Sequence, residues 1–132
     1  MSYYLAKTEP GTYSIDDLET DGTTLWDGVH NHQAIAYIKQ MQPGDHVFIY
    51  HSVKEKKVVG EAEVTGKPFE NKNDPRFSWA VELKFIKKFN GPTLSDCKAN
   101  PVCNGFKLVT HSRLSTMSVP DDVASWISAY NG

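Results

Sequence analysis

The sequence predicts an α+β domain in which several short strands curl into a small, partly open β-barrel with flanking helices. Two observations lead to this fold class. Apolar residues recur with a period of two through the middle of the chain, over residues 46–51, 58–64 and 79–85, as expected for strands. Helical spacing occurs before and after this stretch, over residues 31–41 and 120–130. Strands grouped together, with helices placed early and late, are typical of α+β architecture.

Length and composition fit a single domain over residues 1–132. A chain of 132 residues that is 39% hydrophobic can bury a substantial core without a second domain. No run of about 18 apolar residues and no signal-peptide pattern occurs, so we expect no membrane partner. The expected location is the cytoplasm in a bacterium or the nucleus in a eukaryote. Cys97 and Cys103 lack the close pairs of a structural zinc site and are expected to be reduced thiols.

The first elements of the chain are a short strand and a short helix. Residues 3–7 alternate as in a strand, which ends at residues 9–11 because Pro has no N–H to donate and Gly follows it. The polar residues 7–9 therefore lie at a strand end. Ser14 followed three residues later by Asp17 resembles a capping box, which predicts the start of a short helix.

The stretch from Trp26 to Asn31 carries the residues best suited to hold a ligand. Asp27-Gly28 is a turn signal that would hold Trp26 at a corner. Asn31 is suited to cap a helix whose apolar residues recur at helical spacing from Ala34 onward. Such a corner could hold an aromatic ligand by stacking, while nearby polar groups form hydrogen bonds with the edge of that ligand. The alternative is that Trp26 only covers the core and Asn31 only caps the helix.

Period and turn signals predict the remaining elements. Residues 46–51 suit a buried strand that emerges at the polar pair His51-Ser52. In its partner strand, Gly60 leaves room for another backbone or a ligand to approach closely. The pattern further predicts a polar loop at residues 71–75, a strand at 79–85 and a helical turn at 94–98. An extended segment at 113–119 and a last helix opened by Pro at 120–130 follow.

Charge is distributed unevenly along the chain. The net charge of −2 argues against a protein that holds nucleic acid by bulk electrostatics alone. Residues 54–113, however, carry twelve Lys or Arg against seven acidic residues, so the middle of the chain is basic. A basic segment is usually a solvated face. It would favour nucleic-acid binding if its strands lay beside the Trp26 stretch.

Catalytic and metal sites have weak support in the sequence. A hydrolase could be built from His51, Ser52 and Asp74, but adjacent strand residues point to opposite faces and no Gly-x-Ser-x-Gly elbow occurs. His30 and His32 lack a third ligand nearby, so no metal is expected, and no glycine-rich nucleotide motif predicts a cofactor. Binding remains, with two open alternatives: a planar base taken out of its stack, or a planar small molecule.

Six short motifs spread over nearly the whole chain match those of one family. They are Tyr4-Leu5-Ala6-Lys7-Thr8-Glu9-Pro10, Tyr13-Ser14-Ile15-Asp16-Asp17-Leu18, Trp26-Asp27-Gly28-Val29 with Asn31 and Gln33-Ala34, Tyr50-His51-Ser52, Val59-Gly60, and Asp74-Pro75-Arg76-Phe77. On these motifs the sequence resembles the EVE domain of the PUA-like superfamily, a relative of the YTH reader domains. It departs from the family most visibly at His30 and His32, where Arg and Tyr are usual.

The resemblance implies a single PUA-like barrel whose pocket takes a modified base, methylated or hydroxymethylated, from DNA or RNA. It implies no catalysis and no cofactor. Trp26 and Asp27-Gly28-Val29 would form the pocket wall, and polar contacts would come from Lys7, Thr8, Glu9, Asn31, His51 and Ser52. We therefore expect a non-catalytic, monomeric binding module whose downstream action needs a protein partner.

Overall fold

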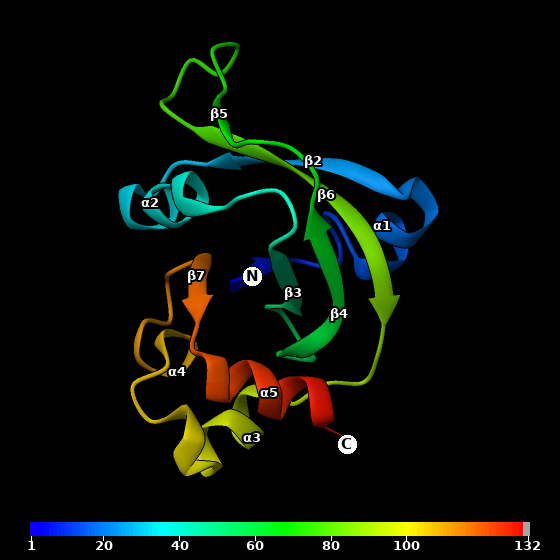
Figure 1. The fold of residues 1–132 in the computed structure, drawn as a ribbon, viewed down its shortest axis with the longest axis vertical. Helices are drawn as coiled ribbons and strands as arrows, with labels where there is room; N and C mark the ends of the chain where they lie inside the picture. Colours follow the sequence, from blue (N-terminus) through cyan, green and yellow to red (C-terminus); the bar gives the residue numbers. More distant parts are fainter. Residues whose placement is uncertain (131–132) are drawn as a thin grey trace.

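Seven strands form one mixed sheet that curls into a partly open barrel (Figure 1). The computed structural model describes residues 1–130. Along the sheet the strands follow the order β2 (Thr23–Val29), β6 (Trp79–Lys88), β4 (Lys57–Val64), β3 (His46–His51), β1 (Tyr3–Thr8) and β7 (Thr116–Val119), and the short β5 (Phe69–Glu70) pairs with β6. Helix α2 (His32–Gln40) packs against both β7 and β6, so it spans the gap between the two ends of this order. The predicted fold class is confirmed.

Strand β1 brings distant parts of the chain together at one end of the barrel. It pairs in parallel with β3, so that Thr8 lies beside His51, and antiparallel with β7. The N–H of Lys7 also donates to the carbonyl of Ser115, at 2.8 Å. The centres of β1 and β3 are apolar and buried in the core, whereas Lys7 and Thr8 at the end of β1 are only partly buried.

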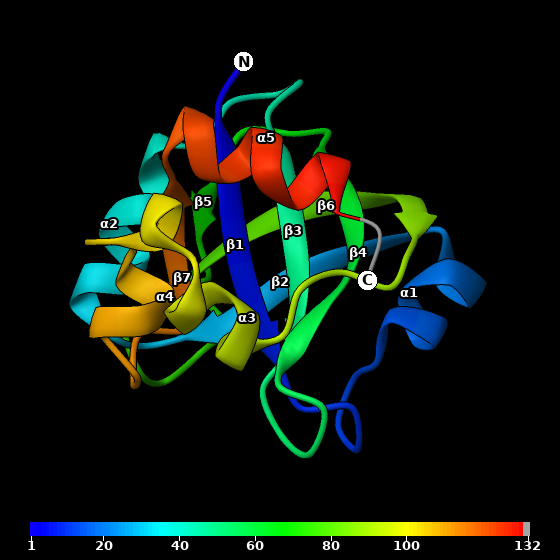
Figure 2. The same cartoon turned by 90° about the horizontal axis from the view of Figure 1, so that it is seen from below.

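The helices begin where the side chains of the sequence can cap them. Helix α1 (Ile15–Asp21) starts with the predicted capping box of Ser14 and Asp17, and Asn31 accepts the N–H of Ala34 at the start of α2. In Figure 2, α5 (Asp121–Ala129) crosses in front of β1 and β3, and its apolar face is buried in the core. The region before β7 holds α3 (Leu94–Ala99), the 3₁₀ turn η1 (Pro101–Cys103) and α4 (Lys107–Thr110). None of the described helices has the length and apolar character of a membrane span.

At Gly60 in β4 the side chain of Ile15, the first residue of α1, lies directly against the sheet. A Cβ atom at Gly60 would lie against the side chain of Ile15 and 2.8 Å from the carbonyl oxygen of Lys87. The close approach predicted for this glycine is therefore made by a helix side chain and a neighbouring strand, and α1 is seated directly on the barrel.

Strand β2 is the main correction to the predicted fold. Asp27 and Gly28 do not form a turn; they lie inside β2, which runs on to Val29. Trp26 pairs with Val81 and Val29 pairs with Trp79, so three steps along β2 match two steps along β6. This irregularity is a β-bulge, which takes up one extra residue without ending the strand. Because the bulge reverses the alternation, Trp26 and Val29 both face into the barrel.

Candidate ligand-binding site

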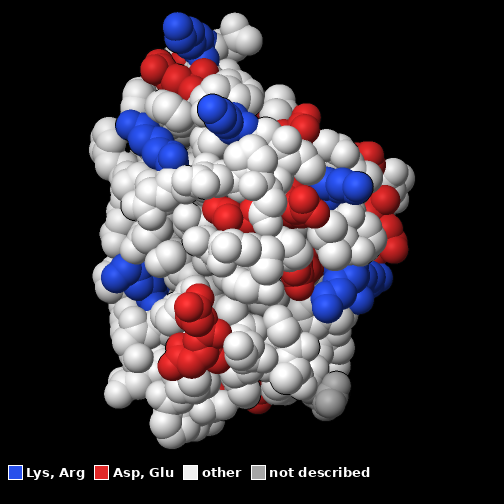
Figure 3. Space-filling view, in the orientation of Figure 1, with Lys and Arg blue, Asp and Glu red and all other residues white. Residues whose placement is uncertain are grey.

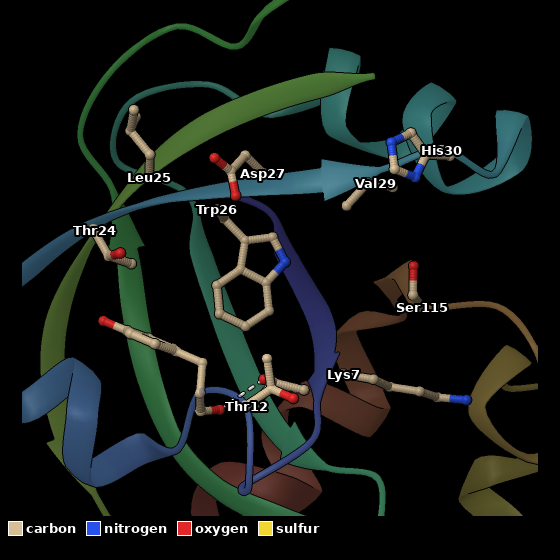
Figure 4. A pocket seen from close by; sticks show the side chains of 11 residues that line it. Lys7, Thr12, Thr24, Leu25, Trp26, Asp27, Val29, His30 and Ser115 are labelled. Carbon is tan, nitrogen blue, oxygen red and sulfur yellow. Dashed lines mark hydrogen bonds between the residues drawn. The ribbon is translucent and has the colours of Figure 1, made fainter. Parts of the chain in front are cut away.

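A cavity of about 520 Å³ opens between the end of β1, the segment before α1, and β2 (Figure 4). Its volume lies within the range of about 300–1,000 Å³ that is typical of small-molecule sites. Hydroxyl, aromatic, apolar and charged side chains share its wall, which is made by Lys7, Thr8, Thr12, Tyr13, Thr24, Leu25, Trp26, Asp27, Val29, His30 and Ser115.

Trp26 is the largest side chain in this wall. Its indole ring projects into the cavity, whereas Leu25 and Asp27 leave β2 on the opposite side (Figure 4). The ring of Tyr13 meets it edge-on, with centroids 6.5 Å apart and planes at 81°. The Tyr13 hydroxyl donates to Asp21 at 2.7 Å, so this ring is held at its far end. Two aromatic rings at right angles therefore form one corner of the cavity wall.

Polar groups from three separate segments surround the rings. The hydroxyl of Thr8 donates to the carbonyl of Tyr13 at 2.7 Å, which ties the end of β1 to the aromatic wall. Thr24 lies two positions before Trp26 on β2, and Thr12 and Ser115 come from loops. A hydroxyl both donates and accepts, so these side chains can read the edge of a planar ligand.

Lys7 lines the cavity with its aliphatic stem more than with its ammonium group. Its ammonium group donates to the carbonyl of Ser112, at 3.0 Å, and points away from Trp26 (Figure 4). Burial lowers the pKa of Lys7 because the charged form is partly removed from water. The cation is therefore held at the edge of the cavity, near the loop before β7.

His30 connects the rim of the cavity to the loop between β5 and β6. Its Nε2 lies 2.8 Å from a carboxylate oxygen of Asp74, and the same oxygen accepts the hydroxyl of Ser78 at 2.8 Å. The other Asp74 oxygen accepts the N–H of Arg76 at 2.9 Å. The Arg76 N–H, then Ser78 and His30, lower the pKa of Asp74 to about 2. This carboxylate fixes the loop to the rim.

The structure places Lys7, Thr8, Trp26, Asp27 and Val29 along this wall, although the Asp27 side chain leaves β2 on the side opposite to Trp26. Their role in ligand binding stays a prediction. For Gly28 the structure describes only its position in β2, between Asp27 and Val29.

The other four predicted site residues lie outside this wall. Glu9 is exposed, and its carbonyl accepts the N–H groups of Thr12 and Tyr13 in the turn after β1. The amide oxygen of Asn31 is engaged in the α2 cap, at 3.0 Å from the N–H of Ala34.

His51 and Ser52 do not form the hydrolytic arrangement that was considered. Buried His51 accepts the N–H of Ile15 through Nε2 at 3.1 Å, and its Nδ1 lies 3.1 Å from Glu55. This contact is the main cause that lowers the pKa of Glu55. Ser52 donates to the carbonyl of Thr8 at 3.3 Å. Asp74 contacts His30, so His51, Ser52 and Asp74 each hydrogen-bond to a different group. His51 instead lines a separate hollow of about 510 Å³ beside α1.

Within residues 1–130 no three His, Cys, Asp or Glu side chains gather in a way that could hold a metal ion. Cys97 and Cys103 are free and buried, and burial raises the pKa of the Cys97 thiol to about 12. Neither thiol faces the cavity described above.

The family model of the EVE domain matches residues 2–130. The chain belongs to the EVE domain family. Thymocyte nuclear protein 1 of Rattus norvegicus is 37% identical over 114 residues, which cover 65% of this chain and 50% of that protein. This EVE domain thus spans about half the length of the curated relatives it matches.

Solved structures share the fold of this EVE domain. A crystal structure of a Pseudomonas syringae protein is 29% identical, covers 97% of this chain and 98% of its own, and has a TM-score of 0.89. The human THYN1 protein, in complex with DNA that contains 5-methylcytosine, has a TM-score of 0.86 at 22% identity over 100% of both chains. At that identity the likeness shows a shared fold alone.

Sequence reasoning missed part of the EVE-domain cavity. Thr24 would have been found by reading residues 23–29 as a strand, because a period of two places it on the face of Trp26. Tyr13 directly precedes the helix cap Ser14, a position that often packs back on its helix. Ser115 carries no local signal, since only the pairing of β1 with β7 brings it to the site.

Proposed function

We propose that this EVE domain is a reader of modified DNA: it takes a modified base into the cavity between β1 and β2 and leaves the base unaltered. The observation that carries the proposal is the Trp26 indole, which projects into a cavity of about 520 Å³ with Tyr13 edge-on beside it. One base–aromatic stack contributes about 1–3 kcal/mol by alanine substitution. A cavity of this size accommodates one base after it has left the helical stack.

The solved relatives support a modified base as the ligand. Human THYN1, which shares this fold, has been crystallised with DNA that contains 5-methylcytosine. In this chain Val29 is buried and lies on the same face of β2 as Trp26, so it offers an apolar surface to a methyl group. One methyl group in an apolar niche is worth roughly 1–3 kcal/mol, so tens-fold discrimination between modified and unmodified bases is the expected scale. The domain would act where such DNA is found, in the nucleus of a eukaryote or the cytoplasm of a bacterium.

A non-catalytic role fits the chemistry of the described side chains. An enzyme that acts on a base needs a general base or nucleophile aimed at one atom. His51 has Nε2 occupied by the N–H of Ile15, and Ser52 donates to a backbone carbonyl. A reader needs only a stacking wall and a few convergent polar groups, which Trp26 and the hydroxyls of Thr12, Thr24 and Ser115 supply.

The test combines a binding titration with product analysis. The protein is titrated with short oligonucleotides that differ only in one cytosine or 5-methylcytosine, as DNA and as RNA, and the recovered nucleosides are analysed by mass spectrometry. We expect selective binding of the methylated DNA and unchanged nucleosides. Turnover that disappears in Ser52→Ala would replace the reader with an enzyme. Equal affinity for both bases, with tight binding of a free planar metabolite, would favour the small-molecule alternative.

A further inference from the structure

A second surface beside the cavity combines exposed aromatic rings with basic side chains. It is formed by α2 and by the segment from Lys67 to Trp79 at the start of β6, and we call it the loop surface. Its members are His32, Lys39, Lys67, Lys72, Arg76, Phe77 and Trp79. The cavity and its proposed stacking ring do not use any of these side chains.

Phe77 is the centre of the loop surface. It is 46% exposed, and unlike a singly exposed apolar residue it lies among another ring and cationic side chains. The ring of His32 stacks beside it, with centroids 5.9 Å apart and planes at 26°. The ammonium of Lys39 lies 5.7 Å from the Phe77 centroid and 4.8 Å from the centroid of Trp79. Phe77 is therefore held in place by its neighbours while much of it still faces solvent.

The loop surface is fixed relative to the cavity. Phe77 lies between Asp74 and Ser78, which share a carboxylate–hydroxyl hydrogen bond of 2.8 Å. That carboxylate also contacts His30, a member of the cavity wall, at 2.8 Å. The backbone of the loop closes on itself through the N–H of Asn71 and the carbonyl of Ser78, at 3.0 Å. A strand that enters the cavity at His30 can therefore reach Phe77 without any rearrangement of the loop.

Charge complementarity identifies the occupant. Lys39, Lys67, Lys72 and Arg76 supply four positive charges. The acidic residues Glu70 and Glu82 also lie in this part of the chain, and the carboxylate of Asp74 is bound by the N–H of Arg76. Figure 3 shows basic side chains over this end of the molecule, where Figure 1 places the β5–β6 loop and α2. Surfaces that bind single-stranded nucleic acid combine aromatic rings, which stack on bases, with cationic side chains, which contact phosphates.

We propose that the loop surface binds the nucleotide next to the modified base and stacks that nucleotide on Phe77, so that the preferred ligand is single-stranded DNA. This inference rests on the proposed reader function. A base inside a duplex is stacked on both faces and offers none to an external ring. An unpaired base is free to stack on Phe77 while its phosphates contact Lys and Arg side chains.

The experiment compares three ligands and three variants. The ligands are a short single strand with one 5-methylcytosine, the same strand in a duplex, and the nucleoside 5-methyldeoxycytidine. The variants are Phe77→Ala, Trp26→Ala and the control Ile86→Ala. Ile86 is 39% exposed near the far end of β6, so its replacement removes a comparable exposed apolar side chain away from the loop surface. Thermal melting checks that each variant is folded.

We expect Phe77→Ala to weaken single-strand binding by about 5- to 150-fold, the equivalent of one base stack, while nucleoside affinity stays unchanged. Trp26→Ala should weaken both, and Ile86→Ala neither. If Phe77→Ala behaves like Ile86→Ala, or loses duplex affinity equally, the role of the loop surface is overturned while the reader function stands. If the wild-type protein binds neither the single strand nor the nucleoside, or Trp26→Ala changes neither affinity, the reader function itself fails. Binding of an acidic protein in place of DNA would also overturn the inference.

Discussion

Replacing Trp26 by Ala separates a ligand-stacking role from a purely structural one. Trp26 is partly buried and contacts Tyr13 edge-on at 6.5 Å, so its loss affects both the fold and the cavity. Removing a fully buried Trp costs about 3–5 kcal/mol, and edge-to-face pairs contribute about 0.5–1.5 kcal/mol. Because Trp26 retains exposure and already borders an empty volume, we expect a loss of about 1–3 kcal/mol in the free energy of unfolding. The loss of one base stack weakens ligand binding by a further ~1–3 kcal/mol, which is roughly 5- to 150-fold in Kd.

The chain offers a matched control in Trp126. This residue is also partly exposed and meets the ring of Tyr130 edge-on, with centroids 5.8 Å apart and planes at 74°. It lies on α5, outside the cavity wall. Trp126→Ala should therefore lower stability by a similar amount and leave the affinity for methylated DNA unchanged.

The assay is a urea unfolding curve for each variant, followed by a titration with the methylated oligonucleotide at a temperature where both variants are folded. Reduced affinity in Trp26→Ala alone supports the stacking role. An unchanged Kd in folded Trp26→Ala would refute it, and so would an equal loss of affinity in both variants, since that pattern would trace the effect to general destabilisation.

Three further predictions concern the framework of the site. Gly60→Ala forces a Cβ against Ile15 and should cost about 1–3 kcal/mol in urea unfolding, whereas Gly66→Ala, with only one neighbour at 3.9 Å, should cost less than about 1 kcal/mol. His51→Ala leaves the buried N–H of Ile15 without its acceptor and should also lower stability by about 1–3 kcal/mol, while any bound nucleoside remains chemically intact by mass spectrometry. The folded-state pKa of Asp74 is depressed to about 2, so its contribution to loop stability is complete above the ordinary value of 3.8 and is lost as pH falls toward 2. Amide NMR signals of the loop should change as the pH falls from 3.8 toward 2. In Asp74→Asn the loop should already be loosened at neutral pH. A loop that is unchanged in either measurement would contradict the proposed role of the Asp74 carboxylate.

Elements specified by local chemistry were predictable from the sequence. The pair Ser14 and Asp17 contains both halves of a capping box, and Asn31 sits where a helix needs an acceptor, so both helix starts were found. Residues 47–50 are apolar, as the centre of a strand buried on both faces requires, and the strand has the predicted bounds 46–51. By contrast, α4 is one turn without a side-chain cap and β5 has two residues, so neither leaves a pattern long enough to recognise.

The cavity was only partly predictable because it is assembled by strand pairing. Asp27-Gly28 permits a turn or a bulge equally well, and only the register of β2 against β6 decides between them. Trp26 was found because its residue type suggested a role. Thr24 and Ser115 were missed, since their chemistry is ordinary and their position depends on partners far away in the sequence.

The antiparallel pairing of β1 with β7 joins the first strand of the domain to its last, and this has a consequence for synthesis on the ribosome. Tyr3 pairs with Val119, so β1 lacks one of its two neighbours until residue 119 has emerged. Contacts of such long sequence separation form slowly because a large loop must close first. Until then an apolar strand edge stays open to other chains, a known route to aggregation. Lys7 and Ser115 meet only through this last pairing, so a nascent or truncated chain cannot yet possess the cavity. Ligand binding should thus report complete folding, and its first appearance during refolding should coincide with the docking of β7.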